Sequence, residues 1–172
     1  YATGTRGSGF CVGKAVAEKI RSGLYWRKEV WHAGDNMKQR FLETLHLEEN
    51  YKRECKLAEN GLPVSIWETY SSFANTEGGV ILLGVREHRD SFEVNGLTER
   101  QLVKYQKDFW SVVNDRNKVS KNILLNHHVA VVEVEGKKFL QIEVPEADRH
   151  DKPVYIGPDP MKGTYRRNYE GD

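Results

Sequence analysis

The sequence contains little cysteine and no long apolar run, and both absences exclude classes of protein. Its 172 residues include two cysteines, Cys11 and Cys55, which form neither a disulfide framework nor a Cys-x-x-Cys pair. No run approaches the roughly 20 apolar residues that span a bilayer, and no charged segment leads into an apolar one at the N-terminus. We therefore expect a cytoplasmic protein that does not enter a membrane.

The chain also has no large excess of one charge, because it contains 26 Lys and Arg residues and 25 Asp and Glu residues. A nucleic-acid surface would then be a local patch and not a property of the whole chain. The length suits one main domain with a sizeable core. The chain begins at Tyr1 without an initiator methionine and ends at Asp172 shortly after a basic cluster, which indicates a fragment of a longer protein.

Signatures of a nucleotide site or a histidine metal site are missing as well. Residues 7–15 are glycine-rich, but Ser8 stands where a phosphate-binding loop needs its first glycine, and Ala15 where it needs Ser or Thr. His127 and His128 are adjacent, and on the strand expected there they would point to opposite faces. Neither stretch predicts a ligand site, and no cofactor is expected.

What is present is a succession of helical and alternating patterns, which predicts an α+β fold with a mixed sheet and packed helices. Thr98 and Gln101 form a capping box that opens a long helix reaching Arg116, and Gly136 lies in the turn of a hairpin. Residues 1–46 are expected to be an N-terminal extension of unknown role with short helices at 12–20 and 37–46. The other expected elements are a helix at 63–74 and strands at 51–57, 80–85, 129–134, 138–144, 153–156 and 164–167.

Residues 70–85 join a helical pattern, two glycines and an apolar run. This order is the reverse of a phosphate-binding loop, in which the glycines follow a strand and precede a helix. Asn75, Gly78 and Gly79 are therefore predicted to form a structural turn that ends the helix. The run after them is apolar on both faces, which predicts a central strand.

The strand expected at 51–57 places Glu54 between Lys52 and Lys56 on one face. This row has three interpretations: a solvated ion-pair row, part of a metal site, or a support for a bound phosphate. Arg86 and Arg116 lie at the ends of an expected strand and helix, and Arg166 and Arg167 lie on an expected terminal strand beside Tyr165. Cations with an occasional aromatic are typical of surfaces that track a nucleic-acid backbone. The candidate nucleic-acid-binding residues are Lys52, Lys56, Arg86, Arg116, Arg166 and Arg167.

Five motifs, in this order, resemble the Schlafen-type AlbA domain. They are Glu49-x-x-x-x-Glu54-x-Lys56, the sequence Phe-Ala-Asn-Thr-Glu-Gly-Gly-Val-Ile-Leu-Leu-Gly-Val at 73–85, Gly96-Leu97, Lys152-Pro-Val-Tyr155 and Thr164-Tyr-Arg-Arg167. The resemblance covers about residues 47–168, and we take 47–172 as the domain. It implies a mixed α/β fold and a DNA-binding role in bacterial transcriptional regulators, in which ATPase-like and winged-helix parts follow this domain.

In animal relatives of that family the same fold is an RNA endonuclease whose metal is held by three carboxylates. Glu49 and Glu54 match the first two, while Arg86 stands at the third position and the adjacent Glu87 would face the other side of the strand. An arginine at that position favours phosphate binding. The resemblance thus favours a DNA-binding module over an enzyme. The alternatives are a magnesium- or manganese-dependent ribonuclease using Glu49, Glu54 and Glu87, with RNA as partner, and an oligomerisation or interaction domain that forms homo-oligomers.

Overall fold

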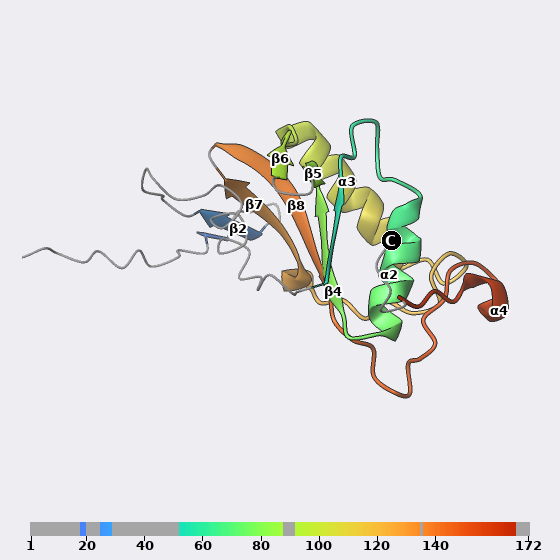
Figure 1. The fold of residues 1–172 in the computed structure, drawn as a ribbon. Coiled ribbons are helices and arrows are strands. Elements are labelled where there is room, and N and C mark those ends of the chain that lie inside the picture. The colour runs from blue at the N-terminus through green and yellow to red at the C-terminus, as the bar shows by residue number, and fades with distance from the viewer. Residues whose placement is uncertain (1–17, 20–24, 29–51, 88–91, 135, 168–172) are drawn as a thin grey trace, which may run out of the picture.

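The computed structural model describes residues 18–19, 25–28, 52–87, 92–134 and 136–167. Within these ranges the chain forms a six-stranded mixed sheet, a separate two-stranded sheet and helices packed against the larger sheet (Figure 1). The α+β fold predicted from the sequence is confirmed.

The large sheet has the strand order β1-β2-β7-β8-β4-β3. β4 pairs antiparallel with β8 and parallel with β3, and all five of its residues are buried, which confirms the predicted central strand. β7 and β8 form the predicted hairpin, with Gly136 at a φ of +75° in its turn. The strands are β1 (Glu18–Lys19), β2 (Tyr25–Lys28), β3 (Arg53–Lys56), β4 (Gly79–Leu83), β7 (Val129–Val134) and β8 (Lys137–Val144).

Two helices, α2 (Ser65–Asn75) and α3 (Glu99–Val113), bury their apolar faces in the main core. The rings of Trp67 on α2 and Phe109 on α3 stack with centroids 5.2 Å apart. Alternation along the strands sends Ile81 and Leu83 towards these helices, while Val80 and Leu82 enter a smaller core on the opposite face. The capping box predicted for α3 is present, since Thr98 Oγ1 accepts from the backbone N–H of Gln101 and Gln101 Oε1 accepts from that of Thr98.

The strand expected over residues 80–85 is interrupted at Gly84, which is a correction to the sequence prediction. Gly84 has a φ of +92°, and a Cβ atom there would lie 2.8 Å from Leu97 Cγ, so the position requires glycine. The chain then leaves the large sheet and forms a two-stranded sheet from β5 (Val85–Glu87) and β6 (Phe92–Val94). Arg86 therefore belongs to this small sheet and not to the central strand.

The N-terminal part of the chain also differs from the prediction where it is described. Residues 18–19 form a strand, although a helix was expected at 12–20. Residues 25–28, for which no element was expected, form β2, which pairs in parallel with β7. Pairing with a strand about 105 positions later gives these residues hydrogen bonds that a local pattern cannot anticipate. The helix expected at 37–46 and the domain boundary at residue 46 lie outside the described residues.

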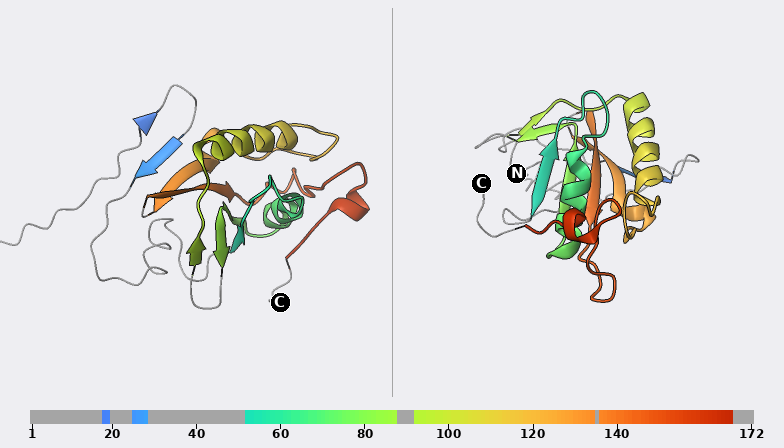
Figure 2. Two further views of the ribbon diagram at one scale, coloured as in Figure 1. Left: turned by 90° about the horizontal axis from the view of Figure 1, so that it is seen from above. Right: turned by 90° about the vertical axis from the view of Figure 1, so that its right-hand side faces the viewer.

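Two predictions about the C-terminal half need correction. The strands expected at 153–156 and 164–167 are reduced to isolated bridges, Tyr155 with Thr164 and Val119 with Ile156, and the short helix α4 (Pro160–Gly163) lies between them. Arg116 follows the end of α3 instead of lying on it, because the helix stops at Val113 and Asn114 caps it. The C-terminal strap, which we define as residues 153–167, runs beside α2 in both views of Figure 2.

The sequence suggested a strand at His127 and His128, and this is wrong. Both residues lie in a 3-10 turn (Asn126–His128), and their ring centroids are 4.2 Å apart. The Nδ1 atom of His128 accepts the backbone N–H of Leu125 at 3.0 Å. Burial lowers the pKa of His128, the neighbouring His127 lowers it further, and Glu143 opposes both.

Because the pKa of His128 is lowered by folding, the unfolded chain binds the proton more tightly than the folded one. This contribution to stability is therefore present above about pH 6.5, the usual histidine pKa, and is lost as the pH falls below it. We expect His128→Asn, whose amide oxygen can accept the same N–H, to show a flatter fall in the free energy of unfolding between about pH 7.5 and pH 5. Urea unfolding at both pH values measures this, and identical pH dependence in the two proteins would contradict it.

Candidate functional site

A cluster of charged side chains lies where β3 meets α2, and we call it the edge cluster: Glu54, Lys56, Ser65 and Arg167. The Lys56 Nζ atom lies 3.1 Å from Glu54 Oε1 and 2.9 Å from the Ser65 hydroxyl. Arg167 approaches the same carboxylate from the other side, with Nη2 3.6 Å from Glu54 Oε2. Two cations therefore share one carboxylate, which gives the cluster a net charge of +1.

The sequence brings these groups together in two ways. Strand alternation places Glu54 and Lys56 on the face of β3 that carries α2, and β3 is the last strand of the described sheet on this side. Arg167 comes from the strap, more than 100 positions later. Its guanidinium lies 5.4 Å from the centroid of the Phe73 ring and Nη1 donates to the Arg53 carbonyl at 3.5 Å, so the side chain is held in place by α2 and β3.

The three charged side chains remain accessible to solvent to different degrees. Lys56 is 12% exposed, Glu54 35% and Arg167 40%. Exposed ion pairs contribute little to stability, because water and salt screen them. Their arrangement therefore matters more for what can bind at this edge than for holding the fold together.

The structure places the other candidate cations at several distances from this cluster. Lys52 directly precedes β3, and its Nζ is 3.0 Å from the Glu77 carboxylate. Arg166 is exposed and directly precedes Arg167, whereas Arg116 is exposed on the turn after α3. Arg86 is half-exposed on β5 and lies 3.9 Å from Glu93. The six candidate cations thus do not gather at one place. Lys56 and Arg167 lie together, because both approach the Glu54 carboxylate.

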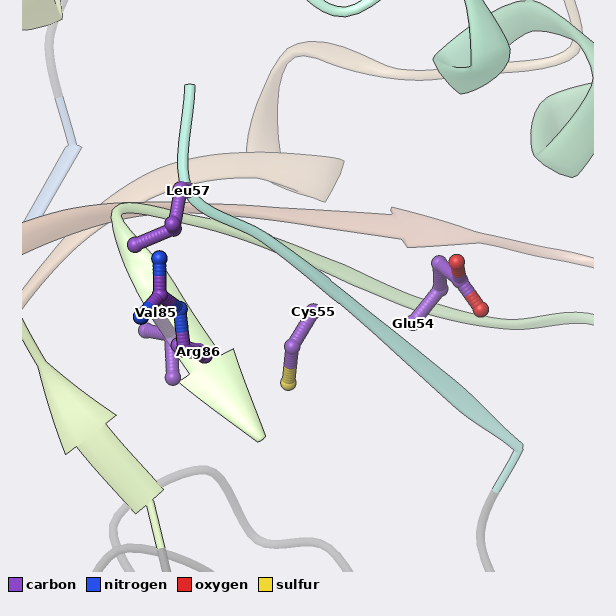
Figure 3. Close-up of a pocket in the computed structure, with 5 residues that line it drawn as sticks. All are labelled: Glu54, Cys55, Leu57, Val85 and Arg86. Atoms are coloured by element: carbon purple, nitrogen blue, oxygen red, sulfur yellow. The ribbon is translucent and has the colours of Figure 1, made fainter. Parts of the chain in front are cut away.

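An open cavity of about 490 Å³ lies beside β3, and its lining residues are Glu54, Cys55, Leu57, Val85 and Arg86. Figure 3 shows Cys55 and Glu54 leaving β3 on opposite sides. Glu54 thus belongs both to the edge cluster and, with Arg86, to the lining of this cavity.

Of the three carboxylates in the alternative metal site, Glu54 is the one whose side chain the structure describes. Glu54 already has two cations beside it, which oppose a divalent ion at that carboxylate. Arg86 occupies the third position, Glu49 lies outside the described residues, and so does the side chain of Glu87. Across the described ranges no group of three His, Cys, Asp or Glu side chains is placed to hold a metal ion.

Sequence reasoning missed a pair of polar side chains on the buried face of α2. Ser71 is fully buried and Asn75 is 6% exposed, and both contact the strap: the Ser71 hydroxyl donates to the Val154 carbonyl at 2.7 Å, and Asn75 Nδ2 donates to the same carbonyl at 2.7 Å. Asn75 was predicted to belong to the turn that ends the helix. It is the last residue of α2, and its side chain links segments 79 positions apart. The available signal was the spacing, since two polar residues four apart within an apolar helical stripe require buried partners.

These features define the class of protein: an α+β domain with a mixed sheet, whose outer strand and C-terminal strap carry a partly exposed group of cations. A family model described as Schlafen, AlbA_2 matches residues 39–170, and the chain belongs to this family. The match begins before the start expected from the motifs, at residue 47, and includes all of the edge cluster.

Among solved structures, the chain is similar to the N-terminal domain of a RecG-related protein from Nitrosomonas europaea. The two share 27% sequence identity with a TM-score of 0.55, over 81% of this chain and 92% of that one. None of the curated proteins compared with the chain matches it. With 15 residues, α3 is too short and too polar to span a bilayer, and none of the helices in the described ranges could do so.

Proposed function

We propose that this domain binds the phosphate backbone of nucleic acid, with duplex DNA as its main partner, and serves as the DNA-binding module of a bacterial transcriptional regulator. The family supports this proposal, as does the similarity to a bacterial protein whose name relates it to an ATP-dependent DNA helicase. The observation that carries it is the convergence of Lys56 and Arg167 on one carboxylate at an exposed edge.

The geometry of the edge cluster is that of a site for an anionic group. A lysine ammonium, an arginine guanidinium and a serine hydroxyl converge there, and these are groups that donate to phosphate oxygens. Glu54 lies beside both cations and neutralises part of their charge. A phosphate that approaches the edge would compete with Glu54 for Lys56 and Arg167, and the exposed Arg166 adds a further cation beside them.

Contacts of this kind give affinity without sequence recognition. Lysine and arginine side chains that neutralise phosphates release counterions, so binding weakens steeply as salt rises, whereas base sequence is read through groove contacts. The cations of the edge cluster lie on a strand and an extended strap, and no helix presents them for insertion into a groove. We therefore expect DNA binding with little preference among sequences.

Glu54→Gln separates binding from cleavage, because the two functions require opposite roles of this carboxylate. For backbone binding, the substitution removes a negative charge that competes with phosphate, and we expect the affinity for duplex DNA to rise by roughly 3- to 10-fold at about 0.1 M salt. For a metal-dependent nuclease, loss of a metal ligand would abolish cleavage instead. Fluorescence anisotropy with a labelled duplex measures the first effect, and gel analysis of structured RNA with magnesium or manganese measures the second.

Glu133→Gln is the matched control for this substitution. Glu133 lies on β7, three strands from β3, at about 14 Å for a strand spacing of about 4.8 Å. This separation exceeds the Debye length of about 10 Å at 0.1 M salt, so its charge should affect the edge cluster little. An affinity that falls in Glu54→Gln, or rises equally in both variants, would contradict the assigned role of Glu54. Metal-dependent cleavage that Glu54→Gln abolishes would favour the ribonuclease.

A further inference from the structure

Ser71 and Asn75 form the best-connected buried polar group among the described residues, and all of their partners outside α2 lie in the strap. Asn75 Oδ1 accepts the backbone N–H of Val154 at 2.8 Å, and Nδ2 donates to the carbonyls of Val154 at 2.7 Å and Tyr165 at 3.2 Å. The Ser71 hydroxyl donates to the Val154 carbonyl at 2.7 Å and accepts the Tyr165 N–H at 3.0 Å. Within α2, Asn75 Nδ2 lies 3.2 Å from Ser71 Oγ.

Tyr165 is held through both of its backbone groups, and this residue directly precedes the arginine pair. Its N–H bonds to Ser71, and its carbonyl, which belongs to the peptide bond that leads into Arg166, bonds to Asn75. The orientation of that peptide determines where the next two side chains start. Two residues later, Arg167 reaches Glu54 and the ring of Phe73. The contacts of α2 with the strap thus continue directly into the edge cluster.

The chemistry of these contacts requires an amide at position 75. The side chain must accept one N–H and donate to two carbonyls at once, which neither a carboxylate nor an apolar side chain can do. Longer side chains would not fit, because the position is 6% exposed and faces the strap backbone directly. The buried amide of Asn75 can therefore form all three hydrogen bonds only when Val154 and Tyr165 of the strap lie in one position against α2.

We propose that Asn75, assisted by Ser71, is a positioning residue for nucleic-acid binding: it fixes the strap so that Arg166 and Arg167 face the backbone phosphates together with Lys56. This inference rests on the proposed function. Asn75, which lies in the family motif at 73–85, would then act on a binding surface formed by residues about 90 positions later in the chain. A purely structural role for Asn75 would stabilise the domain without any coupling to the two arginines.

A double-mutant cycle distinguishes the two roles. The variants are Asn75→Ala, Arg166→Ala with Arg167→Ala, and the triple combination, each tested for affinity to a labelled DNA duplex over a range of salt. If Asn75 acts through the arginines, Asn75→Ala should weaken binding and lower the salt slope, and the triple variant should bind no more than about twofold weaker than the arginine pair variant. Two results would overturn the inference. One is a loss of affinity in the triple variant equal to the product of the losses in Asn75→Ala and in the arginine pair variant; the other is an Asn75→Ala protein that binds DNA as the native protein does.

Two further variants keep the test independent of stability. Ser71→Ala removes only the contacts of the hydroxyl, so it should give a smaller loss with the same dependence on the arginines. Ile142→Val, in the core strand β8, destabilises without removing any hydrogen bond of Ser71 or Asn75, and should leave DNA affinity unchanged. Hydrogen exchange provides a local readout: in Ser71→Ala the amide of Tyr165 should exchange faster relative to those of β4, and unchanged relative exchange would count against the mechanism.

The arginine pair variant also separates failure of this inference from failure of the proposed function. If Arg166→Ala with Arg167→Ala binds DNA as the native protein does, the phosphate-binding proposal itself is wrong. If that variant loses affinity and Asn75→Ala adds its own independent loss, the proposed function stands and the positioning role fails.

Discussion

Replacing Arg166 and Arg167 with alanine is expected to weaken the binding of duplex DNA by about 10- to 100-fold at 0.1 M salt. Each phosphate contact contributes about 0.9 to the slope of log affinity against log salt, which corresponds to roughly tenfold in affinity per contact at this concentration. The slope should also become shallower by about 2. Fluorescence anisotropy with a duplex of about 20 base pairs, repeated between about 50 and 200 mM salt, gives both quantities.

The control for this variant removes the same charge from another surface. Arg100 and Lys104 are exposed and four positions apart on α3, so Arg100→Ala with Lys104→Ala lowers the net charge by the same amount. If DNA responds only to the total charge of the domain, both variants should lose affinity equally, and the strap would then have no special role. A loss confined to the strap variant supports a local phosphate-binding surface.

Substituting Gly78 with alanine is expected to cost about 2–5 kcal/mol in the free energy of unfolding. The residue has a φ of +79°, and a Cβ atom there would lie 2.7 Å from the Val144 carbonyl and 3.1 Å from the backbone nitrogen of Glu146. The left-handed conformation costs a non-glycine residue about 1–2 kcal/mol, and displacing packed backbone adds about 1–3 kcal/mol. The turn therefore needs glycine both for its conformation and for the close approach of the end of β8.

Gly157→Ala separates these two costs. Gly157 has nearly the same conformation, with a φ of +77°, but a Cβ atom there would meet nothing within 4 Å. We expect it to lose about 1–2 kcal/mol, from the backbone conformation alone. Chemical denaturation of both variants measures the difference. Equal losses would show that contact with β8 does not matter, and a negligible loss in Gly78→Ala would contradict the structure of the turn.

Much of the fold could be predicted because its elements follow from local patterns. The apolar run after Gly79 indicated the central strand, Thr98 and Gln101 marked the start of α3, and the glycine at 136 marked the hairpin. In each case the spacing of apolar residues and a capping or turn residue agreed, and such agreement makes a sequence prediction specific.

The errors arose where distant parts of the chain determine the structure. Gly84 lies within an apolar run, and only its packing against Leu97 shows that the strand must end there. Residues 25–28 become a strand because they pair with β7, about 105 positions later. The strap forms isolated bridges instead of strands because part of its backbone bonds to Ser71 and Asn75. Tertiary contacts overrode local preference in all three cases.

The candidate site was predicted in part. Alternation along β3 correctly placed Glu54 and Lys56 on one face, and the sequence identified Arg167 as a candidate cation. The sequence could not show that Arg167 and Lys56 share the Glu54 carboxylate, nor that Arg86 lies on β5 beside Glu93, because these contacts depend on how the strap returns to α2 and how the chain turns at Gly84.

The salt dependence of DNA binding by the native domain tests the central claim most directly. If Lys56, Arg166 and Arg167 each contact one phosphate, the slope of log affinity against log salt should be about −2.7, and the affinity should fall roughly 40-fold between 50 and 200 mM salt. A slope near zero, or self-association of the domain without any binding of DNA, would contradict the account and favour an interaction domain.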